Sequence, residues 1–244
     1  MFLREAVTRI ARDRMAWVWL LVEPIFHVAV VMYMFSVIRQ RVVFGADPAV
    51  FIMLGVLAFL IPRNMMNRCR SAVGQNRALY TYRQVLPVDA VLVRAAIEAF
   101  LQSVVVLVVL AGAGFLGRDV TPVDPLGALM AVGAMMLMGL GLGLLISVTN
   151  DLAPNVARVM RLLMAPLYFL SAVLYPSMLP PPALRELLLW NPLVHGIETL
   201  RISFMPQYHI PPGIDLGYLV ACAVTLVFLS LALHVRYQKA LLAR

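Results

Sequence analysis

The chain has 244 residues, of which 62% are hydrophobic and only 13% are charged. Soluble domains carry about 25% charged residues, so the composition excludes an ordinary water-soluble domain. The apolar residues gather in blocks of about twenty, the length a helix needs to cross a ~30 Å hydrocarbon core. We therefore expect an all-α polytopic membrane protein. The net charge of +8 then bears on orientation in the membrane, and no nucleic-acid partner is expected.

The N-terminal segment, 1–16, alternates pairs of apolar and polar residues, which on a helix gives two opposite faces. A basic face above an apolar underside suits an amphipathic helix that lies in the membrane interface. The alternative is a cytosolic helix packed on the protein. No cleavable signal is expected, because the apolar block that follows runs to Ile38 and is too long for one. The basic residues of this segment are Arg4, Arg9, Arg12 and Arg14.

The rest of the chain, 17–244, reads as a single transmembrane domain with short loops. Six spans place both termini on the same side of the membrane. Fifteen of the 20 Lys and Arg residues then fall on the side of the termini and five on the other. By the positive-inside rule the termini are cytoplasmic. The spans are predicted at about 17–38, 49–66, 90–116, 125–148, 156–175 and 216–235.

The longest cytoplasmic stretch lies between the second and third spans and contains "GQNRALYTYRQVLP". A short helix here would offer Arg77, Tyr80, Tyr82 and Arg83 to a soluble partner, and Tyr and Arg dominate protein interfaces. A solvated loop that faces lipid headgroups explains the same residues equally well.

Charged residues inside spans are costly and usually face a bundle interior or a cavity. Two oppositely charged or polar pairs are spaced four apart on one helix face, and each pair can satisfy itself. A polar pair that serves packing is the favoured interpretation, and contact with a transported substrate is the alternative. The pairs are Glu23 with His27 and Arg94 with Glu98; Arg158 and Arg161 of the fifth span can instead extend to the interface.

The fourth span contains "MGLGLGLLIS", which places Gly139 and Gly143 at small-xxx-small spacing. Small residues at this spacing let two helices approach closely. We favour packing within one subunit over contact between subunits.

The segment before the last span, about 180–205, is apolar but broken by proline. Three prolines at 180–182 suit a helix start, and Asn191-Pro192 ends that helix and begins a second. Two half-length helices predict a re-entrant hairpin. Non-helical backbone at membrane depth is tolerated only where protein buries it or a cavity touches it, so the hairpin lines or closes a path on the outer side, or merely caps that face. Three polar residues of its second helix are candidates for a network that holds an outer gate shut: His195, Glu198 and Arg201.

Motifs of enzymes are missing from the sequence. It has no Walker A loop, no HExxH, no G-x-S-x-G and no zinc-spaced His and Cys. We expect no catalysis and no cofactor or metal site in this chain. A membrane enzyme and a passive channel or scramblase remain the rival classes.

Several stretches resemble the membrane subunits of ABC-2 exporters, and among them the capsular polysaccharide export permeases. The resemblance covers nearly the whole chain and includes the amphipathic N-terminus. The stretches are "EPIFH" (23–27), "NRALYTYRQVLPVDAVLVRAAIEAF" (76–100), "PLYFLSAVLYP" (166–176) and "LLLWNPLVHGIETLR" (187–201).

The resemblance implies a homodimer in the bacterial inner membrane, with each copy bound to a separate cytoplasmic ATPase that holds ATP and Mg²⁺. A coupling helix at about 75–84 would make that contact, and the hairpin would form the outer gate. The implied cargo is a lipid-linked capsular polysaccharide, passed on to a periplasmic co-polymerase and an outer-membrane export protein. O-antigen, teichoic acid or a drug are alternative cargoes of related permeases. The coupling residues would be Gln75, Asn76, Arg77, Tyr80, Tyr82 and Arg83.

Two sets of residues are candidates for contact with such a cargo. The four N-terminal arginines would gather an anionic lipid head or acidic polymer, because a basic rim raises the local concentration of anions. Aromatic side chains would stack on sugar rings, although such residues more often serve packing or interface anchoring. These are Tyr33, Tyr168, Tyr175 and Trp190.

Overall fold

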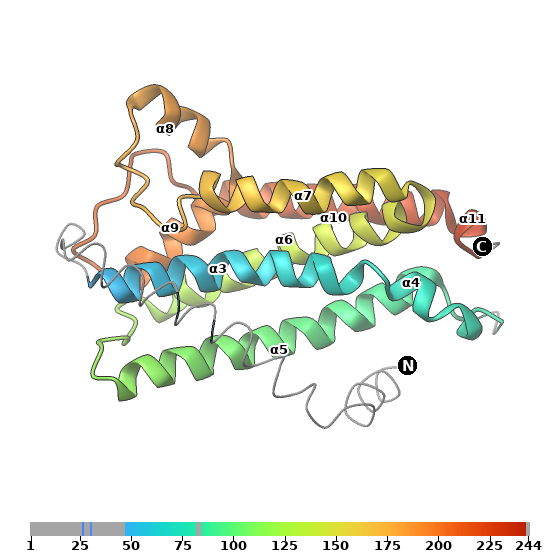
Figure 1. Ribbon diagram of the computed structural model, residues 1–244, viewed down its shortest axis with the longest axis horizontal. Coiled ribbons are helices and arrows are strands. Elements are labelled where there is room, and N and C mark those ends of the chain that lie inside the picture. The colour runs from blue at the N-terminus through green and yellow to red at the C-terminus, as the bar shows by residue number, and fades with distance from the viewer. Residues whose placement is uncertain (1–25, 27–29, 31–46, 82–83, 243–244) are drawn as a thin grey trace.

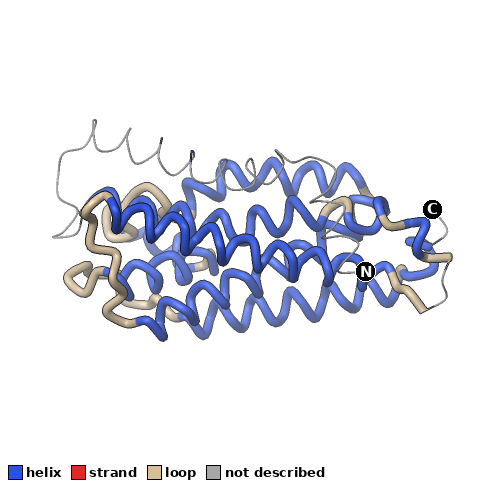
Figure 2. Tube along the Cα trace, turned by 90° about the horizontal axis from the view of Figure 1, so that it is seen from below, coloured by secondary structure: helices blue, strands red, loops and turns tan. Residues whose placement is uncertain are grey.

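The computed structural model describes residues 26, 30, 47–81 and 84–242 of the chain, and their regular structure is entirely helical (Figure 2). The predicted interface helix and, apart from Phe26 and Val30, the predicted first span lie outside this part. Within it, four helices are long and apolar enough to cross a membrane. They are α3 (Pro48–Cys69), α5 (Pro87–Phe115), α6 (Pro125–Leu152) and α10 (Leu216–Arg236).

The long helices lie side by side, and α7 (Pro154–Leu170) runs along them (Figure 1). One end of the bundle carries α8 (Pro182–Leu189) and α9 (Pro192–Phe204), which we call the outer hairpin. The opposite end carries α4 (Ala72–Gln75), the 3₁₀ helix η1 (Arg77–Leu79) and α11 (Gln238–Leu242). This second end also holds the turn between α6 and α7, and the charge distribution predicts that it is cytoplasmic.

Proline begins six of the described helices: α3, α5, α6, α7, α8 and α9. A first-turn proline loses no hydrogen bond and has its φ already set for a helix. Three helices are also capped by the preceding side chain, which accepts a backbone N–H bond: Asp47 from Ala49 (2.9 Å), Asp124 from Gly127 (2.9 Å) and Asn191 from Leu193 (3.0 Å). Local residues, a first-turn proline and in three cases a capping side chain, therefore determine where these helices begin.

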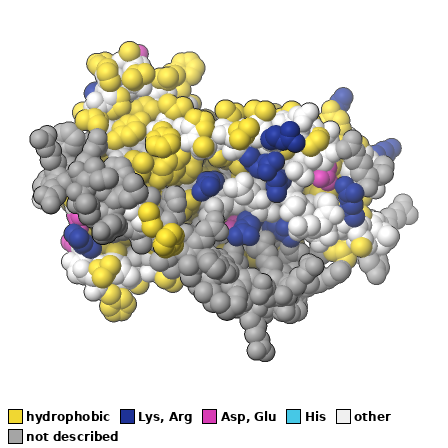
Figure 3. All heavy atoms as spheres, in the orientation of Figure 1, with side chains coloured by type: hydrophobic (Ala, Val, Ile, Leu, Met, Phe, Trp, Pro, Cys, Tyr) yellow, Lys and Arg dark blue, Asp and Glu magenta, His cyan; other side chains and the backbone are white. Residues whose placement is uncertain are grey.

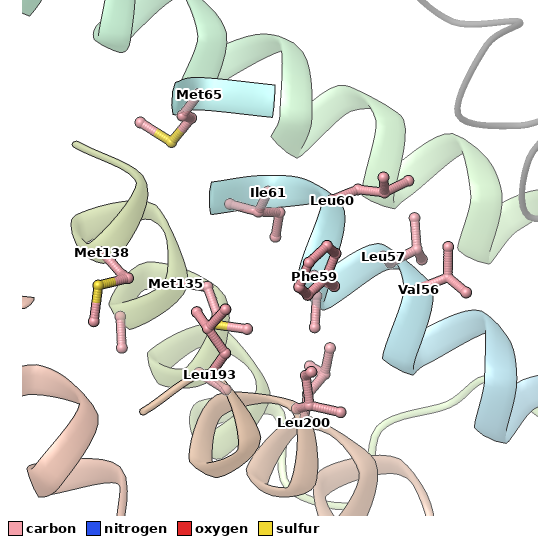
Figure 4. Close-up of a cluster of buried hydrophobic side chains, with 14 of the residues drawn as sticks. Val56, Leu57, Phe59, Leu60, Ile61, Met65, Met135, Met138, Leu193 and Leu200 are labelled. Carbon is pink, nitrogen blue, oxygen red and sulfur yellow. The ribbon is translucent and has the colours of Figure 1, made fainter. Parts of the chain in front are cut away.

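Helix α3 is the centre of the bundle. In its most apolar window 89% of the residues are buried inside the molecule, against 17% for α10. Phe59 and Ile61 of α3, Met135 of α6 and Leu200 of α9 converge in the core (Figure 4). The outward faces of α5 and α10 stay apolar and exposed, for example at Phe100 and Phe228. Such faces suit lipid rather than water.

The glycines of α6 bring it into close contact with α3. A Cβ on Gly139 would lie 2.7 Å from Met65 Sδ and 3.0 Å from Pro62 Cα. A Cβ on Gly143 would lie 3.0 Å from Cys69 Cβ. The expectation that these glycines pack within one subunit is confirmed.

Two predicted boundaries differ from the structure. The fifth span was expected to reach 175, but α7 ends at Leu170 because residues 171–175 form a turn whose carbonyls at Ala172 and Val173 accept from Arg201 of α9. A single coupling helix over 75–84 was also expected. Residues 72–79 instead form α4 and η1, because the Asn76 side chain donates to Ala72 O (2.8 Å) and ends α4. By contrast, the two helices expected in the outer hairpin, separated by a break at Asn191-Pro192, agree with the bounds of α8 and α9.

We predict that Gly139→Val destabilises the protein by about 1–3 kcal/mol, the usual cost of overpacking a core. The added side chain has no room between Met65 and Pro62. The matched control is Gly133→Val on the same helix, where a Cβ meets nothing within 4 Å. Thermal unfolding in detergent measures both, and equal midpoints would contradict this packing.

Candidate functional site

The outer hairpin is held to the bundle by one fully buried guanidinium, that of Arg201 on α9. Its Nη1 donates to Ala172 O (2.9 Å) and its Nη2 to Val173 O (2.6 Å), both in the turn that follows α7. Its Nε donates to Phe51 O of α3 (3.3 Å). A single side chain therefore joins α9, α3 and the end of α7, and we call this arrangement the Arg201 clamp.

The residues around the Arg201 guanidinium leave room for it and make favourable contacts with it. The guanidinium carbon lies 3.6 Å from the centre of the Phe51 ring, a cation–π contact. Gly55, one turn along α3, leaves the space, since a Cβ there would collide with the guanidinium. Ala172 has φ +53°, a left-handed conformation that costs energy for a residue other than glycine. Its bond to Arg201 helps to hold that conformation.

Glu198 supplies the countercharge. Its Oε1 accepts from Arg201 Nη1 at 2.8 Å, and both side chains are completely buried. Removing one member of a buried pair leaves an uncompensated charge, which is strongly destabilising.

His195 does not join this pair, although all three residues were expected in one network. Its Nδ1 accepts from the backbone N–H of Asp215 (2.9 Å), so its Nε2 carries the proton that it donates to Leu189 O (2.8 Å). The ring also packs on Tyr218, with centroids 4.9 Å apart. His195 thus ties the outer hairpin to the start of α10, while Glu198 and Arg201 tie it to α3 and α7.

At the cytoplasmic end, residues 72–81 form a compact structure that we call the partner-facing segment. Arg94 Nη1 of α5 donates to Gln75 Oε1 (2.9 Å), which fixes α4 on the bundle. Arg77 Nη2 lies 4.0 Å from Asp151 Oδ2 at the end of α6. Asn76 caps α4 as described above, so Gln75 and Asn76 hold the segment while Arg77 stays half exposed. Tyr82 and Arg83 lie outside the described residues.

Tyr80 folds back on this segment, and its hydroxyl donates to Val73 O at 3.1 Å. Burial, and then the nearby carboxylates of Asp151 and Asp89, raises the pKa of Tyr80 to about 12, while Arg77 opposes the shift. The phenol is therefore neutral at physiological pH. The stability that it contributes is present below its ordinary pKa of about 10 and is lost as the pH rises towards 12.

Basic side chains gather over the middle and the cytoplasmic end of one face of the bundle (Figure 3). At the seam between α3 and α7 the buried residues Met66 and Ala157 belong to one packed cluster. Arg63 is three residues before Met66 on α3, and Arg158 and Arg161 are one and four residues after Ala157 on α7. From the 1.5 Å helical rise, Arg63 lies about 9 Å from the cytoplasmic end of α3 and Arg161 about 10 Å from that of α7. We call Arg63, Arg158 and Arg161 the arginine face. Residue spacing alone did not single out Arg63, because only the packing of α3 on α7 brings it to this seam.

The candidate aromatic residues have different surroundings. Tyr168 is half-buried and packs edge-on against Phe59, with centroids 5.1 Å apart. The Tyr175 hydroxyl donates to Phe169 O (2.9 Å). Trp190 is 78% exposed in the turn of the outer hairpin and is the most exposed of the candidates that the structure describes. Arg4, Arg9, Arg12, Arg14 and Tyr33, and the pair Glu23 and His27, lie outside the described residues.

The other expected pair, Arg94 and Glu98, is buried in α5. Arg94 donates to Gln75 and to Arg68 O (3.4 Å), and Glu98 Oε1 accepts from Gln102 Nε2 (3.3 Å). Arg94 therefore joins α5 to α3 and α4, whereas this bond of Glu98 lies within α5. Nor does the described part of the chain contain a group of three His, Cys, Asp or Glu residues able to hold a metal ion.

Comparison with known protein families shows which family the chain belongs to. The family model described as "ABC-2 type transporter" matches residues 1–205. The chain belongs to the ABC-2 type transporter family. As a membrane subunit of such a transporter it is a permease of the inner membrane, and ATP hydrolysis belongs to a separate ATPase subunit.

Among its relatives, the polysialic acid transport protein KpsM of Escherichia coli is 30% identical over 242 residues, covering 99% of this chain and 93% of the relative. The capsule polysaccharide export inner-membrane protein CtrC of Neisseria meningitidis is 27% identical over 249 residues, with coverage of 98% and 90%. The protein BexB of Haemophilus influenzae, of the same description, is 24% identical over 239 residues, again with 98% and 90% coverage.

For this permease we predict that Arg201→Met lowers the free energy of unfolding by about 3–5 kcal/mol, because Glu198 stays buried without its partner. Arg118→Met is the matched control. Arg118 pairs with Asp47 at 2.9 Å, but these side chains are 47% and 31% exposed, and exposed pairs contribute about 1 kcal/mol or less. Denaturation in detergent would contradict the clamp if the two variants lost equal stability.

Proposed function

We propose that this ABC-2 permease exports a lipid-linked capsular polysaccharide from the cytoplasm towards the periplasm. The observation that carries the proposal is the likeness, over 98–99% of this chain, to relatives named for polysialic acid transport and capsule polysaccharide export. An export permease for O-antigen, teichoic acid or a drug would share the family but not this set of relatives.

The arginine face supports an anionic cargo. Arginine at membrane depth is costly and usually marks a substrate path or a paired charge. Arg63 and Arg161 are half-buried and Arg158 is exposed, and the guanidinium group binds phosphate and carboxylate in a bidentate manner. The phosphate of a lipid carrier or the acid groups of a capsular polymer would meet these side chains early on the route from the cytoplasm. The N-terminal arginines would extend the same basic surface.

The transporter would contain two copies of this chain. Helix α7 packs on α6 and α3, and Ala157 is its one fully buried residue. Its outward side carries Val159, Leu162 and Leu163, each more than half exposed. A second permease copy and the cargo lipid would cover this side. Trp190, Tyr168 and Tyr175, together with Tyr33, would contact sugar rings along the route, and among the first three Trp190 is the most exposed.

The partner-facing segment would bind the ATPase, one ATPase for each permease copy. Gln75 and Asn76 hold the segment through their hydrogen bonds, and Gln75, Arg77 and Thr81 are exposed. On the outer side, the hairpin would act as the gate, with the Arg201 clamp and His195 keeping it closed. A periplasmic co-polymerase and an outer-membrane export protein would receive the polymer there.

We predict that replacing Arg63, Arg158 and Arg161 together by Gln reduces export of an acidic capsular glycolipid at least about tenfold. One hydrogen bond to a charged group contributes about 1.5–3 kcal/mol, which is enough for that loss. Replacement by Lys should keep a larger share of export, because the charge remains. Cell-surface polysaccharide is quantified in cells that lack their own permease and express this chain with its ATPase.

Arg118→Gln, at the outer end, is the control and should export normally. Equal export by the Gln triple variant and the wild type would remove the arginine face from the cargo path. Failure of the wild-type chain to export capsular glycolipid, together with export of another glycolipid or a drug, would overturn the cargo assignment.

A further inference from the structure

One carboxylate, Asp151, lies between the partner-facing segment and α7. Its side chain is only 8% exposed, and its Oδ2 is 4.0 Å from Arg77 Nη2. A Cβ on Gly74 would be 3.8 Å from its Oδ1, so α4 also packs against it. Two positions of the partner-facing segment, Gly74 and Arg77, therefore lie against one residue of α6, and the charge of Asp151 also contributes to the raised pKa of Tyr80.

Asp151 lies in the last turn of α6, close in sequence to the start of α7. Helix α6 ends at Leu152 and α7 begins at Pro154, so a single residue, Ala153, separates them. The backbone N–H of Ala153 donates to Thr149 O (2.8 Å), and that of Ala157 donates to Ala153 O (3.2 Å). This turn is short and hydrogen-bonded on both sides. A displacement of Asp151 must therefore move the first turn of α7.

The other end of α7 is fixed. The Arg201 clamp holds Ala172 and Val173, and Asn191 Nδ2 donates to Ser171 Oγ (2.8 Å). The one fully buried residue of α7, Ala157, lies in its first turn, and from there to Leu170 the helix packs only through partly exposed side chains. A helix that is anchored at its outer end and displaced at its inner end tilts. Arg158 and Arg161 lie near the inner end and would move most.

We propose that Asp151 is a positioning residue, through which movement of the partner-facing segment tilts α7 and with it Arg158 and Arg161 of the arginine face. The inference rests on the proposed function in one respect, that the ATPase docks on the partner-facing segment. It adds a mechanical link between ATP hydrolysis and the cargo path, in which the carboxylate transmits displacement without touching cargo or nucleotide.

The test uses the complete transporter, this chain with its own ATPase, in lipid nanodiscs. A reporter cysteine replaces Val156, which is 49% exposed in the first turn of α7, and Cys222 is replaced by Ser. A water-soluble maleimide is added with and without ATP and vanadate, and trapped ADP is quantified in every sample. In the otherwise unchanged chain, trapping should alter the labelling rate at least threefold. In Asp151→Asn the change should fall below 1.5-fold, and Asp151→Glu should retain at least half of it.

Asp119→Asn is the matched control, because Asp119 is an exposed carboxylate at the outer end that bonds Thr121; it should label like the unchanged chain. The proposal is overturned if trapping leaves the labelling rate unchanged in the parent, or if Asp151→Asn keeps the full change. Failure of Asp151→Asn to trap ADP would also overturn it, since Asp151 would then serve ATPase binding. No cargo is needed, so a wrong cargo assignment would appear in the export assay and leave this result intact.

Discussion

The architecture of the outer half depends on one buried arginine. A guanidinium removed from water is tolerated only where nearly all of its donors find partners, and Arg201 achieves this with three backbone carbonyls and Glu198. Because those carbonyls belong to α3 and to the turn after α7, satisfying the charge also fixes the position of α9. The same requirement explains the glycine at position 55 and the left-handed backbone at Ala172. The ion pair and hydrogen bonds of Arg201 thus hold the outer hairpin in place, in addition to its buried apolar contacts.

This constraint divides the bundle into a rigid part and a displaceable part. Helices α3, α6 and α9 share a close-packed core, in which glycine contacts and large apolar side chains leave little freedom. Helix α7 is held at its two ends and rests on the core through few buried groups. The elements that open in a functional cycle are drawn from the less stable parts of a structure. The basic residues proposed to meet the cargo lie on this helix and on the neighbouring edge of α3.

Local features of the sequence predicted much of this fold. Proline and Asn191 mark the hairpin's two helices, because a first-turn proline and a side-chain cap act within a few residues. The glycine spacing in α6 predicted a close approach but not its partner helix. Contacts between distant segments could not be predicted from spacing: the carbonyl partners of Arg201, the separation of His195 from the ion pair, and the meeting of Asp151 with residues 74–80. The single helix expected over 75–84 was wrong in form, since the side chain of Asn76 ends α4 and η1 follows it.

The central claim is that this permease works through an ATPase bound at the partner-facing segment. The most direct test is purification of the chain from native membranes in mild detergent, with and without the triple change Tyr80→Ala, Tyr82→Ala and Arg83→Ala. The account predicts that an ATPase carrying a Walker motif accompanies the unchanged chain and is lost from the variant, while a control change at the outer end, Tyr175→Ala, retains it. If no ATPase accompanies the unchanged chain, the claim is contradicted and a passive channel becomes the better account. An ATPase retained equally by both would contradict the assignment of these coupling residues.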